Sequence, residues 1–296
     1  MWGPPQIKRR RFVPELQARV DRQVDHLHGG TDGVLRRAEF EGYINAMQLH
    51  GQVALVTGGG RGLGRATALA LAGRGCDVVA ADILADEVRE TERIVRERGV
   101  RGLGVYCDVS NEAAVAGLIE RVVSEFGRLD VLVNTVAWID PPGLLVDMPL
   151  EVWENTLKYD LTTHFLCCKH ALRGMIERNY GRIVNVSSEA GNGGYRLRGS
   201  YCAAKAGVIR LSQTLAAETT EYDIRVNAIC PRGIAGVRVD TLRSMFDEYF
   251  EMHGGQRRGP RPSGSGDMDP AEVAELIVFL VSPEGARING QAITIG

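Results

Sequence analysis

The chain has 296 residues, of which 44% are hydrophobic and 24% charged, a composition typical of a globular protein with one large α/β domain or two small ones. The formal net charge is only −2 at pH 7, so bulk electrostatics gives no reason to expect a nucleic-acid partner. No apolar run approaches the roughly 20 residues needed to cross a bilayer, and no apolar stretch follows the basic start, so we expect neither a membrane partner nor secretion.

The six cysteines lie in apolar contexts and form no CxxC pair, which favours reduced thiols in a cytoplasmic protein. The six histidines show no HExxH or similar spacing. We therefore predict no metal site.

The first 50 residues form an N-terminal extension that differs from the rest of the chain. Leu16, Val20, Val24 and Leu27 recur at helical spacing with charges between them, and the glycine-rich stretch 28–33 ends this pattern. A second, weaker helical pattern follows. The segment is either a partly disordered tail or a helical arm packed on the body or on a partner subunit. The arm is favoured, because the apolar stripe would otherwise be exposed.

Residues 51–296 alternate short runs rich in Val and Ile with stretches of 3.6-residue apolar periodicity. The runs expected as buried strands are 53–58, 77–82, 103–109, 129–134, 181–188, 224–230 and 291–295. This alternation predicts one domain of the Rossmann type, with about seven parallel strands and helices on both faces. Right-handed crossovers make such a sheet doubly wound and place its ligand crevice at the carboxyl ends of the strands.

The regular pattern loosens over 237–269. A helical stretch at 239–252 is followed by a Gly/Pro/Arg/Ser-rich loop at 253–267. A long irregular insertion in a compact domain is usually functional, so we expect a lid over the substrate.

A glycine-rich turn joins the first expected strand to a helix in VALVTGGGRGLGRATALALAGRG. Backbone without side chains can approach a pyrophosphate, which lies at the positive N-terminus of such a helix. Placement between strand and helix makes this turn more specific than glycines alone. The residues predicted to bind a dinucleotide here are Gly58, Arg61, Gly62, Leu63 and Gly64.

Asp82 ends the next expected strand. A carboxylate there can accept from both hydroxyls of an adenosine ribose and repels a 2′-phosphate; a solvated loop aspartate is the alternative. Arg61 favours the opposite choice, because it can pair with a 2′-phosphate. We weigh Asp82 more heavily, since a phosphate beside it loses Coulomb energy on the order of 1 kcal/mol or more. The predicted cofactor is therefore NAD, with NADP the alternative.

Tyr201 and Lys205 stand four residues apart in SYCAAKAG, so they share one face of a helix. A tyrosine hydroxyl has an ordinary pKa near 10, and a nearby ammonium lowers it toward the range of a useful acid/base. Ser188 ends an expected strand and is suited to hydrogen-bond the same substrate oxygen. The tyrosine–lysine pair alone arises often by chance. Together with this serine and the nucleotide turn it predicts a catalytic set.

The motifs TGGGRGLG, YCDV, VLVN, IVNVSS, YCAAK and VNAICP occur in this order along the chain. With them the sequence resembles the short-chain dehydrogenase/reductase family over about residues 50–296. The resemblance implies that Tyr201 is the general acid/base and that Lys205 lowers its pKa and binds the nicotinamide ribose. Ser188 would orient the carbonyl or alcohol. Family members are commonly homo-oligomers, so a dimer or tetramer is expected by analogy.

Further cofactor contacts follow from the same resemblance. Asp108 and Val109 would border the adenine, and Asn134 would lie against the adenosine. Pro231 and Ile234 would flank the nicotinamide, with the backbone of Ile234 meeting its carboxamide.

Several positions depart from the family pattern. The usual NNAG reads NTVA at 134–137, and the Pro-Gly pair and a later threonine are replaced around Arg232 and Gly236. The family's fourth catalytic residue, an asparagine that supports a water near the lysine, falls on Asp160. An aspartate still accepts from water, but its charge can change the proton affinity of the relay. The catalytic serine, tyrosine and lysine are retained, so an active enzyme remains the main hypothesis.

The predicted reaction is reversible hydride transfer between NAD(H) and a secondary alcohol or its ketone, with Tyr201 taking or giving the proton. The residues expected around the substrate are Trp138, Ile139, Pro141, Tyr195, Leu197 and the 237–269 insertion. The aromatic pair Trp138 and Tyr195 suggests an apolar or ring-bearing substrate; ordinary packing beneath the lid is the alternative.

Five arginines near this region are Arg196, Arg198, Arg257, Arg258 and Arg261. They would hold a carboxylate or phosphate of the substrate, or they are simply solvated. The competing hypothesis for the whole chain is a dinucleotide-binding sensor or scaffold without turnover. It would bind NADH tightly yet show no activity on a broad panel of alcohols and ketones. Double-bond reduction on the same fold is disfavoured by the intact serine–tyrosine–lysine set.

Overall fold

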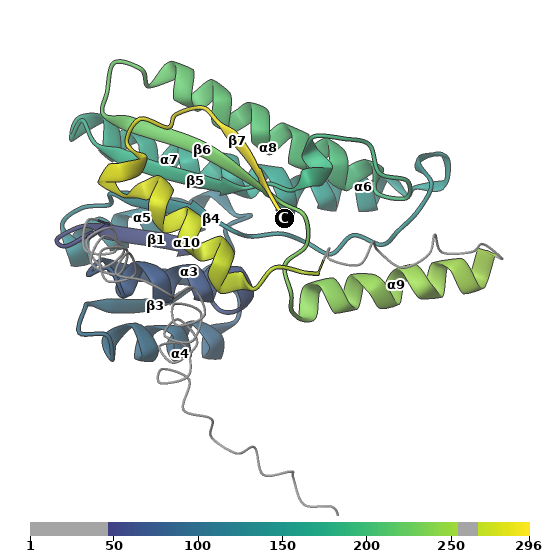
Figure 1. The fold of residues 1–296 in the computed structure, drawn as a ribbon, viewed down its shortest axis with the longest axis horizontal. Helices are drawn as coiled ribbons and strands as arrows, with labels where there is room; N and C mark the ends of the chain where they lie inside the picture. Colours follow the sequence, from purple (N-terminus) through teal and green to yellow (C-terminus); the bar gives the residue numbers. More distant parts are fainter. Residues whose placement is uncertain (1–46, 254–265) are drawn as a thin grey trace, which may run out of the picture. The chain divides into compact units, whose positions relative to one another are not determined.

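One sheet of seven parallel strands forms the centre of the fold, in the spatial order β3-β2-β1-β4-β5-β6-β7 (Figure 1). In the computed structural model, which describes residues 47–253 and 266–296, the strands are β1 (Val53–Thr57), β2 (Asp77–Asp82), β3 (Gly102–Tyr106), β4 (Val131–Asn134), β5 (Gly181–Val186), β6 (Ile224–Pro231) and β7 (Ala292–Ile295). Strands β1, β4 and β5 are buried along their whole length, as expected for a sheet covered on both faces. The predicted Rossmann-type fold is confirmed.

Helices cover both faces of this sheet. The helices are α3 (Gly62–Ala72), α4 (Ala85–Arg96), α5 (Glu112–Phe126), α6 (Leu150–Leu157), α7 (Thr163–Glu177), α8 (Gly199–Glu218), α9 (Val237–His253) and α10 (Pro270–Val281). One core joins the sheet to α3 and α10, with Leu71 and Ile277 fully buried. The other core joins it to α5 and α7 through residues such as Val115 and Met175. The apolar stripes of these helices are therefore buried in the two cores.

The strand order places a crevice between β1 and β4. Strand β1 pairs with β2 on one side and with β4 on the other. The chain therefore builds the sheet toward one edge through β2 and β3 and toward the opposite edge from β4 onward. At their carboxyl ends Thr57 lies in register with Ala81 and Asn134. Ligands of open α/β sheets bind at such a switch point.

The packed unit begins a few residues before the boundary expected at 51. Met47 and Leu49 are buried in the same core as α3, and the Leu49 N–H donates to the Arg74 carbonyl at 2.8 Å. The chain accordingly divides before Met47. The helices expected in the N-terminal extension lie outside the described residues. No helix in the described ranges is long and apolar enough to cross a membrane; the cytoplasmic location stays a prediction.

Two irregular elements and the helix α9 border the crevice. A π-helix, η2 (Lys158–Thr162), interrupts the rod formed by α6 and α7, and a short 3₁₀ helix, η3 (Glu189–Gly191), follows β5. The first half of the expected lid is the helix α9, which extends away from the sheet and has no buried residue (Figure 1). Residues 254–265 of that insertion lie outside the described residues.

Candidate active site

A cleft of about 1040 Å³ lies at the carboxyl ends of the strands. It brings together most of the residues expected from the sequence, although they come from six different strand ends and loops. The expected residues that line it are Gly58, Arg61, Gly62, Leu63, Gly64, Asp82, Asp108, Val109, Trp138, Ile139, Ser188, Tyr195, Tyr201, Lys205, Pro231 and Ile234. The cleft therefore has a dinucleotide end at the glycine turn and a chemical end at Tyr201.

The glycine turn is shaped for a close approach of its own backbone. A Cβ on Gly64 would lie 2.0 Å from the Gly58 carbonyl oxygen, so no other residue fits there without moving the turn. Gly58 also adopts a φ of +68°, in the left-handed region that favours glycine. No side chain caps the first turn of α3, which leaves its N–H groups available to an anion. These features fit the pyrophosphate of a dinucleotide.

Asp82 is held in place at the adenosine end of the cleft. Its Oδ2 accepts from the Gly60 N–H at 3.1 Å and its Oδ1 from the Leu84 N–H at 3.2 Å. Each carboxylate oxygen has further acceptor capacity. The side chain is therefore held in a fixed orientation at the lining of the cleft.

Asn134 does not reach the cleft. Its side-chain amide donates to Asn185 Oδ1 at 2.9 Å, and its Oδ1 accepts from the Thr57 hydroxyl at 3.2 Å. The side chain is 1% exposed and ties the ends of β1, β4 and β5 together. Asn134 was expected to lie against the adenosine; it does not line the cleft, whereas the next two residues, Thr135 and Val136, do.

Tyr201 lies in the first turn of α8, surrounded by three cations. The Arg198 guanidinium lies 4.0 Å from its ring centroid, the Arg238 guanidinium 5.5 Å and the Lys205 ammonium 5.7 Å. Burial opposes ionisation of the hydroxyl, but the charges of Arg238 and Lys205 outweigh it, so the pKa of Tyr201 is lowered from its ordinary value. The lysine was expected from the sequence; the larger electrostatic contribution of Arg238 was not.

Arg198 is buried and forms an ion pair with a carboxylate. It is 7% exposed, and its Nη1 lies 3.0 Å from Oδ1 of the fully buried Asp140. The hydroxyl of Ser200 also donates to Asp140, at 3.3 Å. Burial raises the pKa of Asp140 even though Arg198 lowers it. The solvated alternative for Arg198 is therefore wrong, because the guanidinium is buried over the ring of Tyr201 and paired with Asp140. Contact with a substrate anion stays a prediction.

Lys205 is fully buried one turn along α8. Its ammonium donates to the Val186 carbonyl at 3.1 Å and lies 3.4 Å from Asp160 Oδ1. The other oxygen of Asp160 accepts from the Trp138 N–H at 3.3 Å. Asp160 sits inside the π-helix η2, and such turns often mark functional sites because they redirect one side chain. Asp160 thus lies behind Lys205 and does not line the cleft.

The comparisons with known proteins agree with this geometry. A family model described as enoyl-(acyl carrier protein) reductase matches residues 58–296. The cis-4-hydroxycyclohexanecarboxylate dehydrogenase of Sinomonas cyclohexanicum is 38% identical over 249 residues, covering 82% of this chain and 94% of that protein. The chain belongs to the short-chain dehydrogenase/reductase family. It is an oxidoreductase of that family.

Two further members show how far the likeness extends. The 3-oxoacyl-(acyl-carrier-protein) reductase of Vibrio cholerae is 34% identical over 249 residues, covering 84% of this chain and 97% of that protein. The crystal structure of an NAD⁺-bound xylitol dehydrogenase has a TM-score of 0.75 at 32% identity, and covers 83% of this chain and 98% of that one. The matched length of 249 residues leaves unmatched a part of this chain that is about as long as the N-terminal extension.

The Lys205–Asp160 ion pair is where this family member departs from the asparagine-and-water arrangement that the resemblance implies. A carboxylate next to the ammonium counteracts its effect on the phenol, and Asp160 raises the pKa of Tyr201 relative to an uncharged residue. Asp160 contacts Lys205 and Trp138, so it is a positioning residue.

Asp160→Asn is expected to lower the pKa of Tyr201, because it removes this opposing charge. Alcohol oxidation needs the phenolate, which is populated above the pKa, so the acidic limb of kcat/KM should move to lower pH. The pH profile of oxidation is the measurement. An acidic limb that stays in place or moves upward would show that the carboxylate does not act on the phenol. Urea unfolding, run in parallel, separates any loss of stability from the titration.

The substrate side of the cleft is only partly as expected. Trp138, Ile139 and Tyr195 line it, whereas Pro141 and Leu197 do not. Leu197 is buried with a φ of +67°, so its side chain is used in packing a tight turn. Tyr195 is 45% exposed.

The arginines expected here are also redistributed. Arg196 is exposed and does not line the cleft, while residues 257, 258 and 261 lie outside the described residues. Arg198 lines the cleft, and so does Arg238. Arg238 belongs to the predicted insertion but carries no motif of its own, so the sequence offered no signal to select it.

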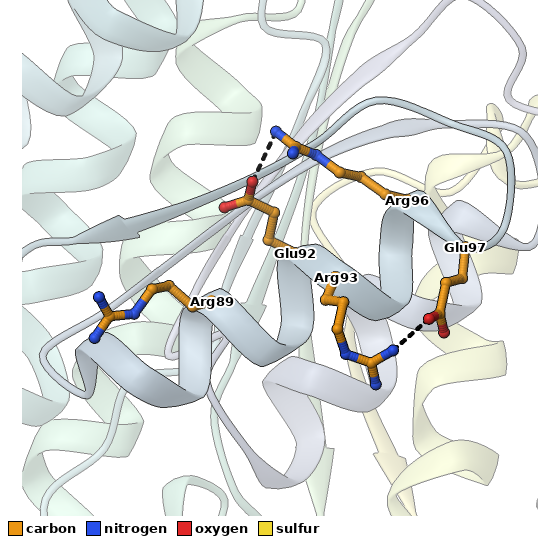
Figure 2. Close-up of a pocket in the computed structure, with 5 residues that line it drawn as sticks. All are labelled: Arg89, Glu92, Arg93, Arg96 and Glu97. Atoms are coloured by element: carbon orange, nitrogen blue, oxygen red, sulfur yellow. Dashed lines mark hydrogen bonds and ion pairs between the residues drawn. The ribbon is translucent and has the colours of Figure 1, made fainter.

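A second hollow lies over the outer side of α4 and has no such chemistry. Figure 2 shows its lining residues, in which Glu92 is bonded to Arg96 and Arg93 to Glu97 along the helix, with Arg89 beside them. Pairs at this spacing on an exposed helix contribute a few tenths of a kcal/mol. Within residues 47–253 and 266–296, no cluster of three His, Cys, Asp or Glu side chains is suited to a metal ion.

Proposed function

We propose that this protein is an NAD-dependent oxidoreductase that interconverts a secondary alcohol and its ketone. The observation that carries the proposal is the placement of Tyr201: its buried phenol lines the cleft among three cations that lower its pKa. A phenol with a lowered pKa can accept a proton in oxidation and return it in reduction.

The residues of the chain divide this work. Tyr201 takes the proton from the substrate hydroxyl, and Ser188 orients the same oxygen from the end of β5. The Ser188 Oγ accepts from the Ala190 N–H at 3.2 Å, which leaves its own proton free to donate to the substrate oxygen. The bound nicotinamide would supply the redox chemistry, and Lys205 would hold its ribose. Together these groups would contact the substrate and the cofactor on one side of the carbon that is oxidised or reduced.

A ring-bearing substrate is supported by the lining and by a relative. Trp138 and Tyr195 face the cleft, and both offer flat apolar surface beside a polar group. The name of the Sinomonas relative describes a ring that carries a hydroxyl. We therefore infer a cyclic secondary alcohol as the substrate class.

The test of this proposal is a dehydrogenase screen over cyclic and aromatic alcohols, with NAD and NADP in parallel. Oxidation of at least one ring alcohol with NAD is the expected result. Tight NADH binding without turnover on any alcohol or ketone would favour the binding-protein hypothesis, which the direct Lys205–Asp160 pair motivates. Reduction of activated double bonds in preference to ketones would instead favour enoyl reduction, the reaction in the family model's description.

NAD is proposed over NADP because the fixed carboxylate of Asp82 faces the ribose position. The neighbour with bound NAD⁺ supports this choice. Asp82→Asn is expected to lower kcat/KM with NAD by about 10- to 100-fold, since a hydrogen bond to a charged group contributes about 1.5–3 kcal/mol. Activity with NADP should rise over the same change, because the repulsion of a 2′-phosphate is removed.

The matched control for Asp82 is Asp86→Asn, which removes a carboxylate from the exposed first turn of α4 outside the cleft. It should leave the ratio of the two cofactors unchanged. Parallel losses with NAD and NADP in the Asp82 variant would contradict the proposed selectivity.

A homo-oligomer is proposed through α7 and α8, the long helices that the family resemblance implicates. Phe165 and Ile176 on α7 are exposed at 44% and 37%, which is consistent with a surface covered by a second copy. Sedimentation velocity measures the state directly.

A further inference from the structure

The charges around Tyr201 do not cancel among themselves. Three cations, Arg198, Lys205 and Arg238, meet two carboxylates, Asp140 and Asp160. Arg198 pairs with Asp140 at 3.0 Å and Lys205 with Asp160 at 3.4 Å. Within the described residues, Arg238 has no carboxylate within ion-pair distance. While the phenol of Tyr201 is protonated, one positive charge therefore remains at the chemical end of the cleft.

Arg238 is placed where the substrate must bind. It lies in the first turn of α9, and its Nη2 donates to the Trp138 carbonyl at 2.8 Å. Its guanidinium also lies 5.5 Å from the centroid of the Tyr201 ring. A guanidinium has five N–H donors, so these two contacts leave others available. The side chain is exposed and lines the cleft.

This position excludes the phosphates of the dinucleotide as the natural partner of Arg238. Those phosphates would lie at the glycine turn and the N-terminus of α3. Arg238 contacts Trp138 and Tyr201, which form the other end of the cleft.

We propose that Arg238 binds a carboxylate carried by the substrate, so that the substrates are ring-bearing hydroxy acids and the corresponding oxo acids. This inference rests on the proposed function and narrows its substrate class. A carboxylate matches the planar fork of a guanidinium in two parallel hydrogen bonds. Its single negative charge balances that positive charge while the phenol is protonated, the state that returns a proton to the ketone. A doubly charged phosphate would add an excess negative charge close to Asp140 and Asp160.

The geometry also limits the spacer between the two groups. The carbinol oxygen must come within hydrogen-bond distance of the Tyr201 hydroxyl, about 2.6–3.2 Å. The guanidinium that takes the carboxylate lies beside the same ring, 5.5 Å from its centroid. Hydroxyl and carboxylate are therefore separated by a short spacer such as a single ring.

The kinetic test compares a charged and a neutral substrate of the same shape, cis-4-hydroxycyclohexanecarboxylate and cis-4-methylcyclohexanol, in Arg238→Met. We expect KM for the carboxylate to rise by at least about 30-fold, the effect of truncating one partner of a hydrogen-bonded charge pair. KM for the neutral alcohol and Kd for NADH should change less than about three-fold. Since Arg238 also lowers the pKa of Tyr201, kcat falls on both substrates, and the split in KM is the readout.

Two further variants control this comparison. Arg196→Met removes the same charge from an exposed position outside the cleft and should leave both KM values unchanged. Arg238→Lys keeps the charge without the fork and should give an intermediate KM for the carboxylate, which also guards against a folding failure of the methionine variant. An equal rise in KM for both substrates, or weaker binding of NADH, would overturn the inference.

A binding experiment distinguishes this inference from the proposed function. Calorimetry with the NADH-saturated protein compares cyclohexanecarboxylate with cyclohexanecarboxamide. The carboxylate should bind more tightly to the parent protein, and Arg238→Met should abolish the difference. Equal affinity for the two probes would overturn the inference. Arg238-dependent carboxylate binding in a protein that oxidises no alcohol would overturn only the proposed function, and oxidation without preference for the charged substrate would overturn only the inference.

Discussion

Tyr201→Phe is expected to lower kcat for alcohol oxidation by about 10²- to 10⁴-fold, the usual contribution of a general acid–base group. The change removes the hydroxyl that takes the substrate proton and keeps the ring that Arg198 stacks on at 4.0 Å. The fold and the dinucleotide end of the cleft should therefore persist. Turnover followed by NADH absorbance, with Kd for NADH from fluorescence, separates the two effects.

Tyr222→Phe is the matched control, because it removes a hydroxyl just beyond the far end of α8, outside the cleft. It should retain the activity of the parent protein. A Tyr201→Phe variant with nearly full turnover would remove the basis of the proposed mechanism, whatever its affinity for NADH.

Lys205→Met should reduce kcat/KM for oxidation at neutral pH by at least about 10-fold, a part of the usual contribution of general acid–base catalysis, because it removes a charge that lowers the pKa of Tyr201. Loss of the ammonium raises the pKa of Tyr201, so less phenolate is present at neutral pH. The acidic limb of the profile should move to higher pH, and activity should partly recover there. This displacement is opposite in sign to that expected for Asp160→Asn.

The stability of the lysine variant needs a separate measurement, because Asp160 is left as a buried carboxylate without its partner. The double variant Lys205→Met with Asp160→Asn removes both charges. Its free energy of unfolding in urea should exceed that of the single lysine variant, while its oxidation rate at neutral pH stays low. A double variant with restored turnover would show that the lysine acts through folding and not through the phenol.

The sequence predicted the sheet well because local pattern and long-range burial agree. Runs of Val and Ile bounded by turn residues are required when a parallel strand is covered on both faces. Reasoning from the same local patterns placed the start of the domain a few residues too late. Met47 and Leu49 pack into the same core as α3, which lies later in the chain. The sequence pattern assigns Met47 to the second helix of the N-terminal extension, and no pattern marks Leu49.

Residue spacing also identified Tyr201 and Lys205, because residues four apart on a helix are neighbours in any tertiary setting. It could not locate the charges that tune that pair. Arg238 reaches Tyr201 from the first turn of α9 and Arg198 from the residue before α8, and their partners are set by tertiary packing. Asn134 shows a third limit: the sequence places it at the end of a strand, but its hydrogen bond to Asn185 depends on strand pairing that the sequence does not show.

The π-helix η2 has a consequence for the two helices it connects. One extra residue in a helical rod turns everything after it by about 100°, because an α-helix has 3.6 residues per turn. Helix α6 packs on α8, whereas α7 packs on α5 and on strands β4 and β5. The wide turn sets the phase of the two segments independently, so each presents its apolar side to a different neighbour. The register of the whole rod is thus adjusted at the same five residues that hold Asp160 behind the lysine.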